Sequence, residues 1–320
     1  MTKTNEWQNA GPGEEVQSNV STLKKPNIPL GNFTINDFLL LVCILIWALN
    51  SPFVKIALEE IAPLAVSQLR VTLAAVVSLA ILVFRERSFY IAWRHLPLVC
   101  LAALMGITTN QITFIYALSN TSASAISLLY AASPLFSTLL AALIFGERVK
   151  RSYFFGLPLA LVGVVMIILT APNASLDGNV LGNLLAVVMA FSWAAYTVLL
   201  QPLLKYYSPL RLSACCFAIG SLFLIPFSFS QVLTLGDKPV SLVAWLILGF
   251  SAILAMVLTN VIWYSGVKKL GVSRTVYYTY LQPFFGVIAA AILLSELIVP
   301  WQILGGMLVI GSLLIYRLTK

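Results

Sequence analysis

The chain has 320 residues, of which 60% are hydrophobic and 9% are charged, with a net charge of +8. Soluble globular domains carry about 25% charged residues, so this composition excludes an ordinary soluble protein. The mean hydropathy of +0.96 is instead typical of a chain that lies mostly in a lipid bilayer.

The chain begins with a polar segment, residues 1–36, which contains Gly11-Pro12-Gly13 and no apolar run. We expect a disordered tail without a cleavable signal peptide. Apolar runs of about 20 residues, the length that crosses a ~30 Å hydrocarbon core, follow it. They predict an all-α integral membrane protein with ten transmembrane helices, at residues 38–58, 64–84, 96–118, 122–145, 153–170, 180–201, 209–230, 241–266, 272–294 and 299–316.

Lysine and arginine residues predict the orientation of these helices. With ten spans, both termini lie on the same side, and one arrangement places fifteen Lys and Arg residues on that side against Lys238 alone on the other. Cytoplasmic loops carry the excess of Lys and Arg, so both termini are predicted in the cytoplasm. The cations stand in short separate loops, which favours attraction to anionic lipids over nucleic-acid binding.

Residues 117–147 and 266–296 form a repeat, because they align without a gap at a constant offset of 149. Five predicted spans precede the break at Pro172–Ser175 and five follow it, so the second half enters the bilayer from the opposite side. The sequence therefore predicts two inverted five-helix repeats, residues 37–171 and 178–318. Alternating-access carriers use this geometry, with the site near the midplane. The identical pairs include Ser124/Ser273, Pro134/Pro283, Phe136/Phe285 and Glu147/Glu296.

Arg70 is the most costly residue in the predicted spans. An arginine at the centre of a span costs about 2.5–3.5 kcal/mol on insertion scales, so we expect it to face the bundle interior. It could oppose a substrate carboxylate through its planar guanidinium fork. The structural alternative is a tie to helix-end carbonyls, to Glu59 or to Glu60.

Amide and aromatic side chains at membrane depth are the other candidates for the substrate site. Amides there must find partners or line water, and ligand sites are typically apolar and aromatic with a few fixed polar groups. For any single residue, ordinary helix–helix hydrogen bonding or packing is the alternative. The candidates are Trp47, Asn50, Asn110, Gln111, Tyr130, Trp193, Tyr196, Asn260, Trp263, Tyr280 and Gln282.

Three prolines inside predicted spans are candidates for gating. Pro134 and Pro283, at equivalent repeat positions, each remove a helix hydrogen bond from the carbonyl four residues earlier, on Tyr130 and Thr279. Pro52 lies deep in the first span. Freed carbonyls facing a cavity could bind substrate and a kink could act as a hinge, whereas the alternative is a packed kink.

Charged residues at the ends of spans have simpler predicted roles. Glu147 and Glu296 are expected to be helix caps or loop ties to Arg148 and Arg151. Lys55 is close to the outer end of its span, where a long side chain can extend to the interface.

Carboxylate and histidine side chains are absent from the middle of the predicted spans. No Asp or Glu lies there, and the only histidine, His95, stands at a boundary. A carboxylate or histidine proton relay is therefore not visible. Transport would be facilitated, or coupled through an interface carboxylate such as Glu59 or Glu60.

The order and spacing of these features resemble the drug/metabolite transporter superfamily, specifically the ten-span bacterial carriers with two EamA-type domains. The resemblance covers about residues 38–317 and implies a location in the plasma membrane of a bacterium. It also implies export or exchange of small metabolites, often amino acids or related compounds, without ATP. It is carried by Trp47, Asn50 and Lys55, by Arg70, and by the blocks Ala117…Pro134…Gly146-Glu147 and Gly266…Pro283…Ser295-Glu296.

The function predicted from these features is a secondary transporter that exports or facilitates small metabolites by alternating access. The chain has no GxxxxGK[ST] loop for ATP and neither an HExxH nor a GxSxG motif, so it is not predicted to be an enzyme. The alternatives are a membrane scaffold or sensor, or an intramembrane enzyme. The expected partners are a small-molecule substrate, the lipid bilayer and at most a second copy of the chain, with no cofactor, no metal site and no nucleic acid.

Overall fold

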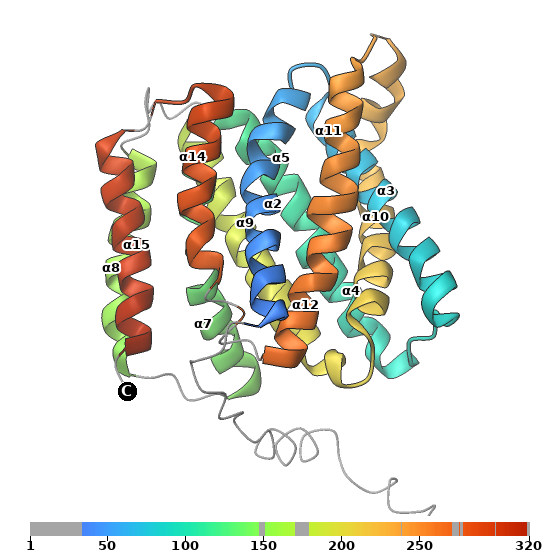
Figure 1. Cartoon of the computed structure of the whole chain (residues 1–320), viewed down its shortest axis with the longest axis horizontal. Coiled ribbons are helices and arrows are strands. Elements are labelled where there is room, and N and C mark those ends of the chain that lie inside the picture. Colours follow the sequence, from blue (N-terminus) through green and yellow to red (C-terminus); the bar gives the residue numbers. More distant parts are fainter. Residues whose placement is uncertain are drawn as a thin grey trace, which may run out of the picture. The chain divides into compact units, whose positions relative to one another are not determined.

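The computed structural model describes most of the chain beyond the predicted tail (Figure 1). Within it, Ile35–Lys320 forms one compact unit. Glu147 and Arg148 lie outside the described residues, as does most of the tail. The described residues are 34–146, 151–169, 179–237, 239–270, 275, 278–297 and 299–318.

The described part of the chain is helical and contains no strand. Short 3₁₀ segments, η1 (Trp93–His95), η3 (Gln201–Lys205), η4 (Thr234–Gly236) and η6 (Tyr278–Leu281), adjoin the α-helices, and two π-helical segments, η2 (Leu104–Thr109) and η5 (Ile253–Leu258), interrupt them. The α-helices are α2 (Ile35–Ala57), α3 (Pro63–Glu86), α4 (Leu96–Ala103), α5 (Asn110–Asn120), α6 (Ala123–Tyr130), α7 (Ser133–Phe145), α8 (Arg151–Leu169), α9 (Asn179–Leu200), α10 (Pro209–Leu233), α11 (Leu242–Ala252), α12 (Thr259–Leu270), α14 (Gln282–Leu294) and α15 (Pro300–Leu318).

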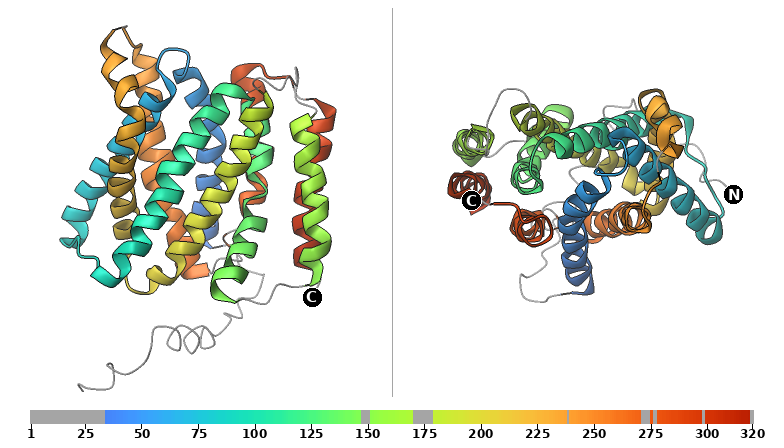
Figure 2. Two further views of the ribbon diagram at one scale, coloured as in Figure 1. Left: turned by 180° about the vertical axis from the view of Figure 1, so that it is seen from behind. Right: turned by 90° about the horizontal axis from the view of Figure 1, so that it is seen from above.

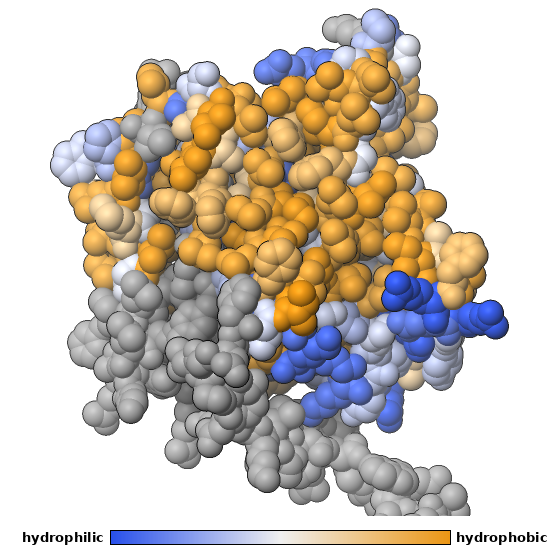
Figure 3. Space-filling model, in the orientation of Figure 1, coloured by the Kyte–Doolittle hydropathy of each residue, from blue (hydrophilic) through white to orange (hydrophobic). Residues whose placement is uncertain are grey.

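Among the described residues, seven helical stretches are long and apolar enough to cross a membrane. Gln282–Leu294 and Pro158–Ile167 are shorter apolar helices. Apolar side chains cover the middle of the face drawn in Figure 3, and hydrophilic ones gather near its upper and lower ends. An all-α integral membrane protein is confirmed, while the spans beyond these seven stay predictions.

Repeat-related helices pack on each other in opposite directions. The second helices of the two halves, α3 and α10, are joined by a bond from the Leu64 amide to Gln231 Oε1 (2.7 Å) and by the Thr72 and Ser221 hydroxyls (2.9 Å). The residue number rises along α3 as it falls along α10. The two halves are therefore inverted relative to each other, as the repeat predicted.

The last helices of the two halves, α8 and α15, also run antiparallel and lie side by side at one edge of the bundle (Figures 1 and 2). A Cβ added to Gly156 would lie 2.8 Å from the Ser312 carbonyl oxygen, and one added to Gly163 would lie 2.5 Å from that of Gly305. Small residues at both positions let the two backbones approach this closely.

Pro134 lies inside the span Ala123–Phe145 as predicted, but neither Pro134 nor Pro283 interrupts a continuous helix, so the predicted position in a helix interior is wrong. Each span breaks just before its proline, α6 ending at Tyr130 and η6 ending at Leu281, and each proline lies in the first turn of the next helix. Proline suits this position because an N–H in the first turn has no intrahelical partner. Pro52, by contrast, lies inside α2 as predicted.

The two π-helical segments were not predicted, yet they follow the repeat. They begin at Leu104 and Ile253 and end at Thr109 and Leu258, so both ends keep the offset of 149. Single-turn π segments inside α-helices are frequent at functional sites. Their symmetric placement marks the same level in both halves of the bundle.

The glycine in the first π segment is required by close packing. A Cβ on Gly106 would lie 2.0 Å from Cγ of Tyr196. Gly106→Ala is therefore expected to lower the free energy of unfolding by about 1–3 kcal/mol through overpacking. The melting temperature of the purified protein in detergent measures this loss.

Gly249→Ala is the matched control, because a Cβ at Gly249 in α11 meets nothing within 4 Å. That variant should melt at the wild-type temperature or above it. Equal melting temperatures for Gly106→Ala and Gly249→Ala would show that the Tyr196 contact does not limit residue size.

Candidate functional site

A cavity lies in the bundle and takes its walls from both halves. Its empty space, including the part open to solvent, is about 690 Å³. Nine predicted site residues line it: Trp47, Asn50, Arg70, Asn110, Gln111, Tyr130, Trp193, Asn260 and Gln282. The remaining lining residues are apolar or small: Ser51, Gly106, Ile107, Phe114, Ile126, Ser127, Met189, Phe217, Ala255 and Met256.

Both π segments and both helix breaks reach this cavity. Gly106 and Ile107 come from η2, and Ala255 and Met256 come from η5. Tyr130 ends α6, and Gln282 begins α14 directly before Pro283. Irregular helical geometry is thus concentrated where the two halves enclose space.

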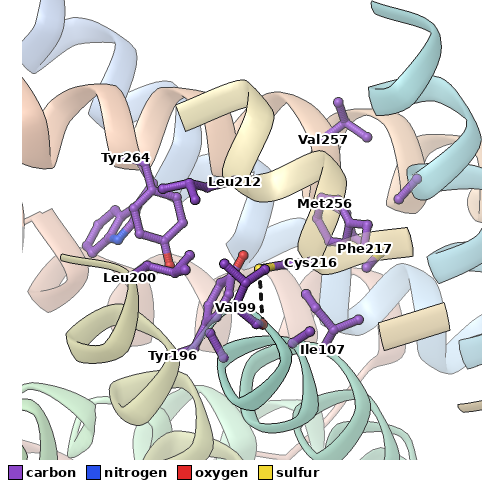
Figure 4. Packing of buried hydrophobic residues seen from close by; sticks show 14 of the residues in the cluster. Val99, Ile107, Tyr196, Leu200, Leu212, Cys216, Phe217, Met256, Val257 and Tyr264 are labelled. Atoms are coloured by element: carbon purple, nitrogen blue, oxygen red, sulfur yellow. Dashed lines mark hydrogen bonds between the residues drawn. The ribbon is translucent and has the colours of Figure 1, made fainter. Parts of the chain in front are cut away.

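Two predicted site residues lie behind the cavity wall. Trp263 is 1% exposed, with its ring centroid 5.4 Å from that of Trp47. Tyr196 is fully buried, and its ring centroid is 5.5 Å from that of Trp193. Figure 4 shows Tyr196 in an apolar cluster with Tyr264, among others. These residues support the wall, and the Tyr280 side chain lies outside the described part of the structure.

The aromatic part of the wall is held firmly in place. The rings of Trp47 and Trp193 meet edge to face at 5.4 Å, and Tyr130 lies 6.4 Å from Trp193. The Trp47 indole nitrogen donates to the Ala255 carbonyl at 3.0 Å. Trp47 belongs to the first helix of one half and Trp193 to the first helix of the other, so this aromatic wall joins the halves.

Arg70 supplies the charge in the cavity. It is 2% exposed, and its guanidinium carbon lies 5.2 Å from the centroid of the Phe114 ring. Its Nε and one terminal nitrogen have no hydrogen-bond partner among the described residues. The predicted alternative of a tie to Glu60 is not seen, because both Glu60 oxygens bind Ser241 at 2.7 Å. The Arg70 donors that lack a partner are therefore available to a ligand that brings acceptor atoms.

Two of the lining amides are structural. Asn110 Nδ2 donates to the Met189 carbonyl (3.0 Å) and to the Ser192 hydroxyl (3.2 Å). Asn50 accepts a bond from the Ser251 hydroxyl. For these two residues, the alternative of ordinary helix–helix hydrogen bonding describes the contacts.

An ion pair that the sequence did not predict joins the halves at one end of the bundle. Glu296, between α14 and α15, accepts bonds from the Ala123 amide (2.9 Å), the Ser124 amide (3.1 Å) and the Ser124 hydroxyl (2.8 Å) at the start of α6. Lys55 Nζ binds Glu296 at 3.1 Å and the Thr121 carbonyl at 2.9 Å. We call this group the Lys55–Glu296 clamp.

Within the clamp, Glu296 accepts bonds from the first amides of α6 and so caps that helix, one of the two roles predicted for it, while Arg148 and the Arg151 side chain lie outside the described residues. Burial raises the pKa of Glu296, but the bonds from Ala123 and Ser124 and the charge of Lys55 more than offset it, so this pKa is lowered from its ordinary value of 4.5. The sequence feature that could have drawn attention to this contact is that Ser124 and Glu296 are each identical to the residue at the equivalent repeat position. Lys55 has no such partner, so its role was visible only after folding.

Other contacts join the halves at the opposite end of α2. The Tyr278 hydroxyl donates to Asp37 at 2.6 Å, and Arg211 pairs with Glu86 at 3.0 Å. Asp37 begins α2 whereas Lys55 stands in its last turn. Polar contacts between the halves therefore lie at both ends of the bundle, with the cavity between them.

Comparison with known proteins agrees with this architecture. Residues 34–169 and 180–318 each match the EamA-like transporter family. A solved crystal structure of 18% sequence identity has a TM-score of 0.61 over 88% of this chain and 97% of its own, and so shares the fold.

Curated relatives cover nearly the whole chain. An uncharacterized transporter of Archaeoglobus fulgidus is 31% identical over 86% of this chain and 94% of its own. A probable amino-acid metabolite efflux pump of Salmonella typhimurium is 27% identical over 88% and 94%, and a probable terminal-alkyne amino-acid exporter of Streptantibioticus cattleyicolor is 28% identical over 88% and 93%. These relatives are transporters, which points away from an enzyme. With two family matches across an inverted, all-helical membrane bundle, the chain belongs to the EamA-like transporter family and is a secondary transporter of small molecules.

Proposed function

We propose that this transporter exports amino acids or related carboxylate-bearing metabolites by alternating access, with the cavity as the substrate site. The observation that carries the proposal is Arg70, a buried guanidinium with unmet donors in a cavity enclosed by both inverted halves. A carboxylate fits this guanidinium because two parallel N–H···O bonds match the fork. The aromatic wall of Trp47, Trp193 and Tyr130 would hold an apolar side chain.

The relatives support the substrate class. Two of those named above are described as an amino-acid metabolite efflux pump and an amino-acid exporter. The cavity lining fits such substrates, because it combines one cation, amides and aromatic rings. A sensor or scaffold would not need a costly buried arginine beside an empty space.

Movement between the two access states would take place at the helix breaks and at Pro52. Gln282 lines the cavity directly before Pro283, and Tyr130 lines it at the end of α6, where the helix breaks before Pro134. A change of helix angle at either break would therefore move the cavity lining. Rocking of inverted halves about a midplane site is the general mode of such carriers. In this scheme the Lys55–Glu296 clamp holds one end of the cavity closed.

The charge pattern of the loops supports cytoplasmic termini, and the bacterial relatives named above support the plasma membrane of a bacterium. The clamp then lies at the outer end, since Lys55 stands in the last turn of the first span. The expected partners remain a small-molecule substrate and the bilayer, with the protein acting as a monomer or homodimer.

Reconstituted protein tests this function. Proteoliposomes loaded with unlabelled L-phenylalanine should accumulate external labelled L-phenylalanine by exchange, without ATP, above the level of protein-free liposomes. Nucleosides, polyamines and sugar phosphates, each tested with and without a pH gradient, provide the comparison. Exchange of one of these classes with no exchange of any amino acid would contradict the proposed substrate class.

A further inference from the structure

Three amide oxygens of the cavity lining have no hydrogen-bond partner among the described residues. They are Gln111 Oε1, Asn260 Oδ1 and Gln282 Oε1. A buried acceptor left without a donor loses its hydration and gains nothing in return. All three oxygens belong to residues that line one cavity, so a ligand there that brings several donors would supply what they lack.

Neighbouring bonds determine which end of two of these amides is the oxygen. Asn260 Nδ2 donates to the Met256 carbonyl at 2.9 Å, and a carbonyl accepts only from the nitrogen end. Asn110 donates to a carbonyl through its own nitrogen, so its oxygen faces Gln111 Nε2 at 3.4 Å. The atoms of Gln111 and Asn260 that lack a partner are therefore the amide oxygens, which accept hydrogen bonds.

We propose that these three oxygens, with the aromatic wall, form a subsite for a substrate ammonium group. This inference rests on the proposed function and narrows its substrate class to zwitterionic α-amino acids with apolar or aromatic side chains. An ammonium has three donors and no acceptor, which matches three unpaired oxygens. Faces of Trp and Tyr rings add cation–π attraction.

The charge of the lining favours a zwitterion over either single ion. Arg70 is the charged residue among the cavity-lining residues, and no carboxylate is among them. A free amine would meet the repulsion of Arg70. An organic acid without any donor group would neutralise Arg70 and leave the three oxygens unpaired. A zwitterion satisfies the unmet donors and the unmet acceptors together.

Titration calorimetry on the purified full-length protein tests the subsite with three probes that share a phenylethyl core: L-phenylalanine, 3-phenylpropanoate, which lacks the amine, and 2-phenylethylamine, which lacks the carboxylate. The wild-type protein should bind L-phenylalanine at least about tenfold more tightly than either analogue, since each analogue leaves buried polar groups unpaired. Gln111→Met, Asn260→Leu and Gln282→Met should each weaken L-phenylalanine binding about tenfold and leave 3-phenylpropanoate binding unchanged.

Gln302→Met is the matched control. Gln302 is 2% exposed and its Nε2 lacks a partner, but the residue lies on α15 outside the cavity lining. This variant should keep the wild-type preference. A monodisperse elution profile establishes that each variant is folded. Gln282 is less buried than Gln111 and Asn260, so Gln282→Met disturbs the fold least.

The outcomes separate the two proposals. Equal wild-type affinity for L-phenylalanine and 3-phenylpropanoate would overturn the ammonium subsite while leaving the carboxylate site at Arg70 intact. An unchanged preference in all three folded amide variants would do the same. Absence of binding of both carboxylate probes would overturn the proposed substrate class itself.

Discussion

Arg70→Ala is expected to abolish selective binding of carboxylate-bearing substrates while leaving the protein folded. Removing one partner of a buried, hydrogen-bonded charge pair costs about 2–5 kcal/mol, which corresponds to roughly 30-fold or more in affinity. In the same variant, 2-phenylethylamine should bind more tightly than to the wild-type protein, because the repulsive charge is gone. The ratio of the two affinities therefore reverses.

The fork of the guanidinium contributes as well as its charge. Arg70→Lys keeps a cation but loses the bidentate geometry, so it should restore only part of the preference for carboxylates. Without ligand, Arg70→Ala should melt no lower than the wild-type protein, since the guanidinium has unmet donors in its buried position. A lower melting temperature without ligand would indicate a structural role.

Arg94→Ala is the control for these measurements, because Arg94 is exposed and lies outside the cavity lining. Its affinities should equal those of the wild-type protein. Unchanged affinity of folded Arg70→Ala for L-phenylalanine and 3-phenylpropanoate would refute the carboxylate site.

Glu296→Gln is expected to loosen the Lys55–Glu296 clamp and to open the outer end of the cavity. The carboxylate accepts bonds from Ala123, Ser124 and Lys55, and charge-assisted hydrogen bonds of this kind contribute about 1.5–3 kcal/mol each. The amide keeps the size of the side chain but loses the charge. The population open at this end should rise by at least about tenfold.

Labelling of a single introduced cysteine measures this change. In a variant whose four native cysteines are replaced, Ser51→Cys places a thiol in the cavity lining. A membrane-impermeant maleimide added outside should react faster when Glu296→Gln is present, and Lys55→Met should act in the same direction. Combining the two clamp changes should add little, because both remove one interaction.

Glu59→Gln provides the control at the same end of the bundle. Glu59 is exposed, and within the described part of the chain it has no side-chain hydrogen bond or ion pair. Glu59→Gln therefore removes the same charge as Glu296→Gln without changing a residue of the clamp. Similar labelling rates in Glu59→Gln and Glu296→Gln would mean that surface charge, and not the clamp, sets the rate.

The pH dependence of the clamp follows from the direction of the pKa shift. The pKa of Glu296 is lowered in the folded protein, so the stabilisation is present above the ordinary value of 4.5 and is lost as pH falls through the lowered value. The ratio of the outside labelling rates of the Ser51→Cys protein with and without Glu296→Gln should therefore stay constant from about pH 5 to 8, because the same thiol titrates in both proteins. Protonation near neutral pH would not open the clamp, in keeping with facilitated transport.

The sequence by itself determined the features that depend on local properties. The length of apolar runs predicted an all-helical membrane protein, and a constant offset between residues 117–147 and 266–296, with an odd number of spans in each half, predicted inversion. Polar side chains at membrane depth must face the bundle interior or a water-filled cavity, so the amides and Arg70 were expected near an enclosed space. Nine of the twelve predicted substrate-binding residues line one cavity.

Only the tertiary structure decided which residues face that cavity and which stand behind it. Apolar periodicity distinguishes a core face from a solvated face, but in a bilayer both faces of a helix are apolar, so the pattern did not separate Trp47 from Trp263. The π segments and the helix breaks before Pro134 and Pro283 depend on packing between helices. The Lys55–Glu296 clamp joins residues 241 positions apart, a contact that exists only once the two halves have packed together.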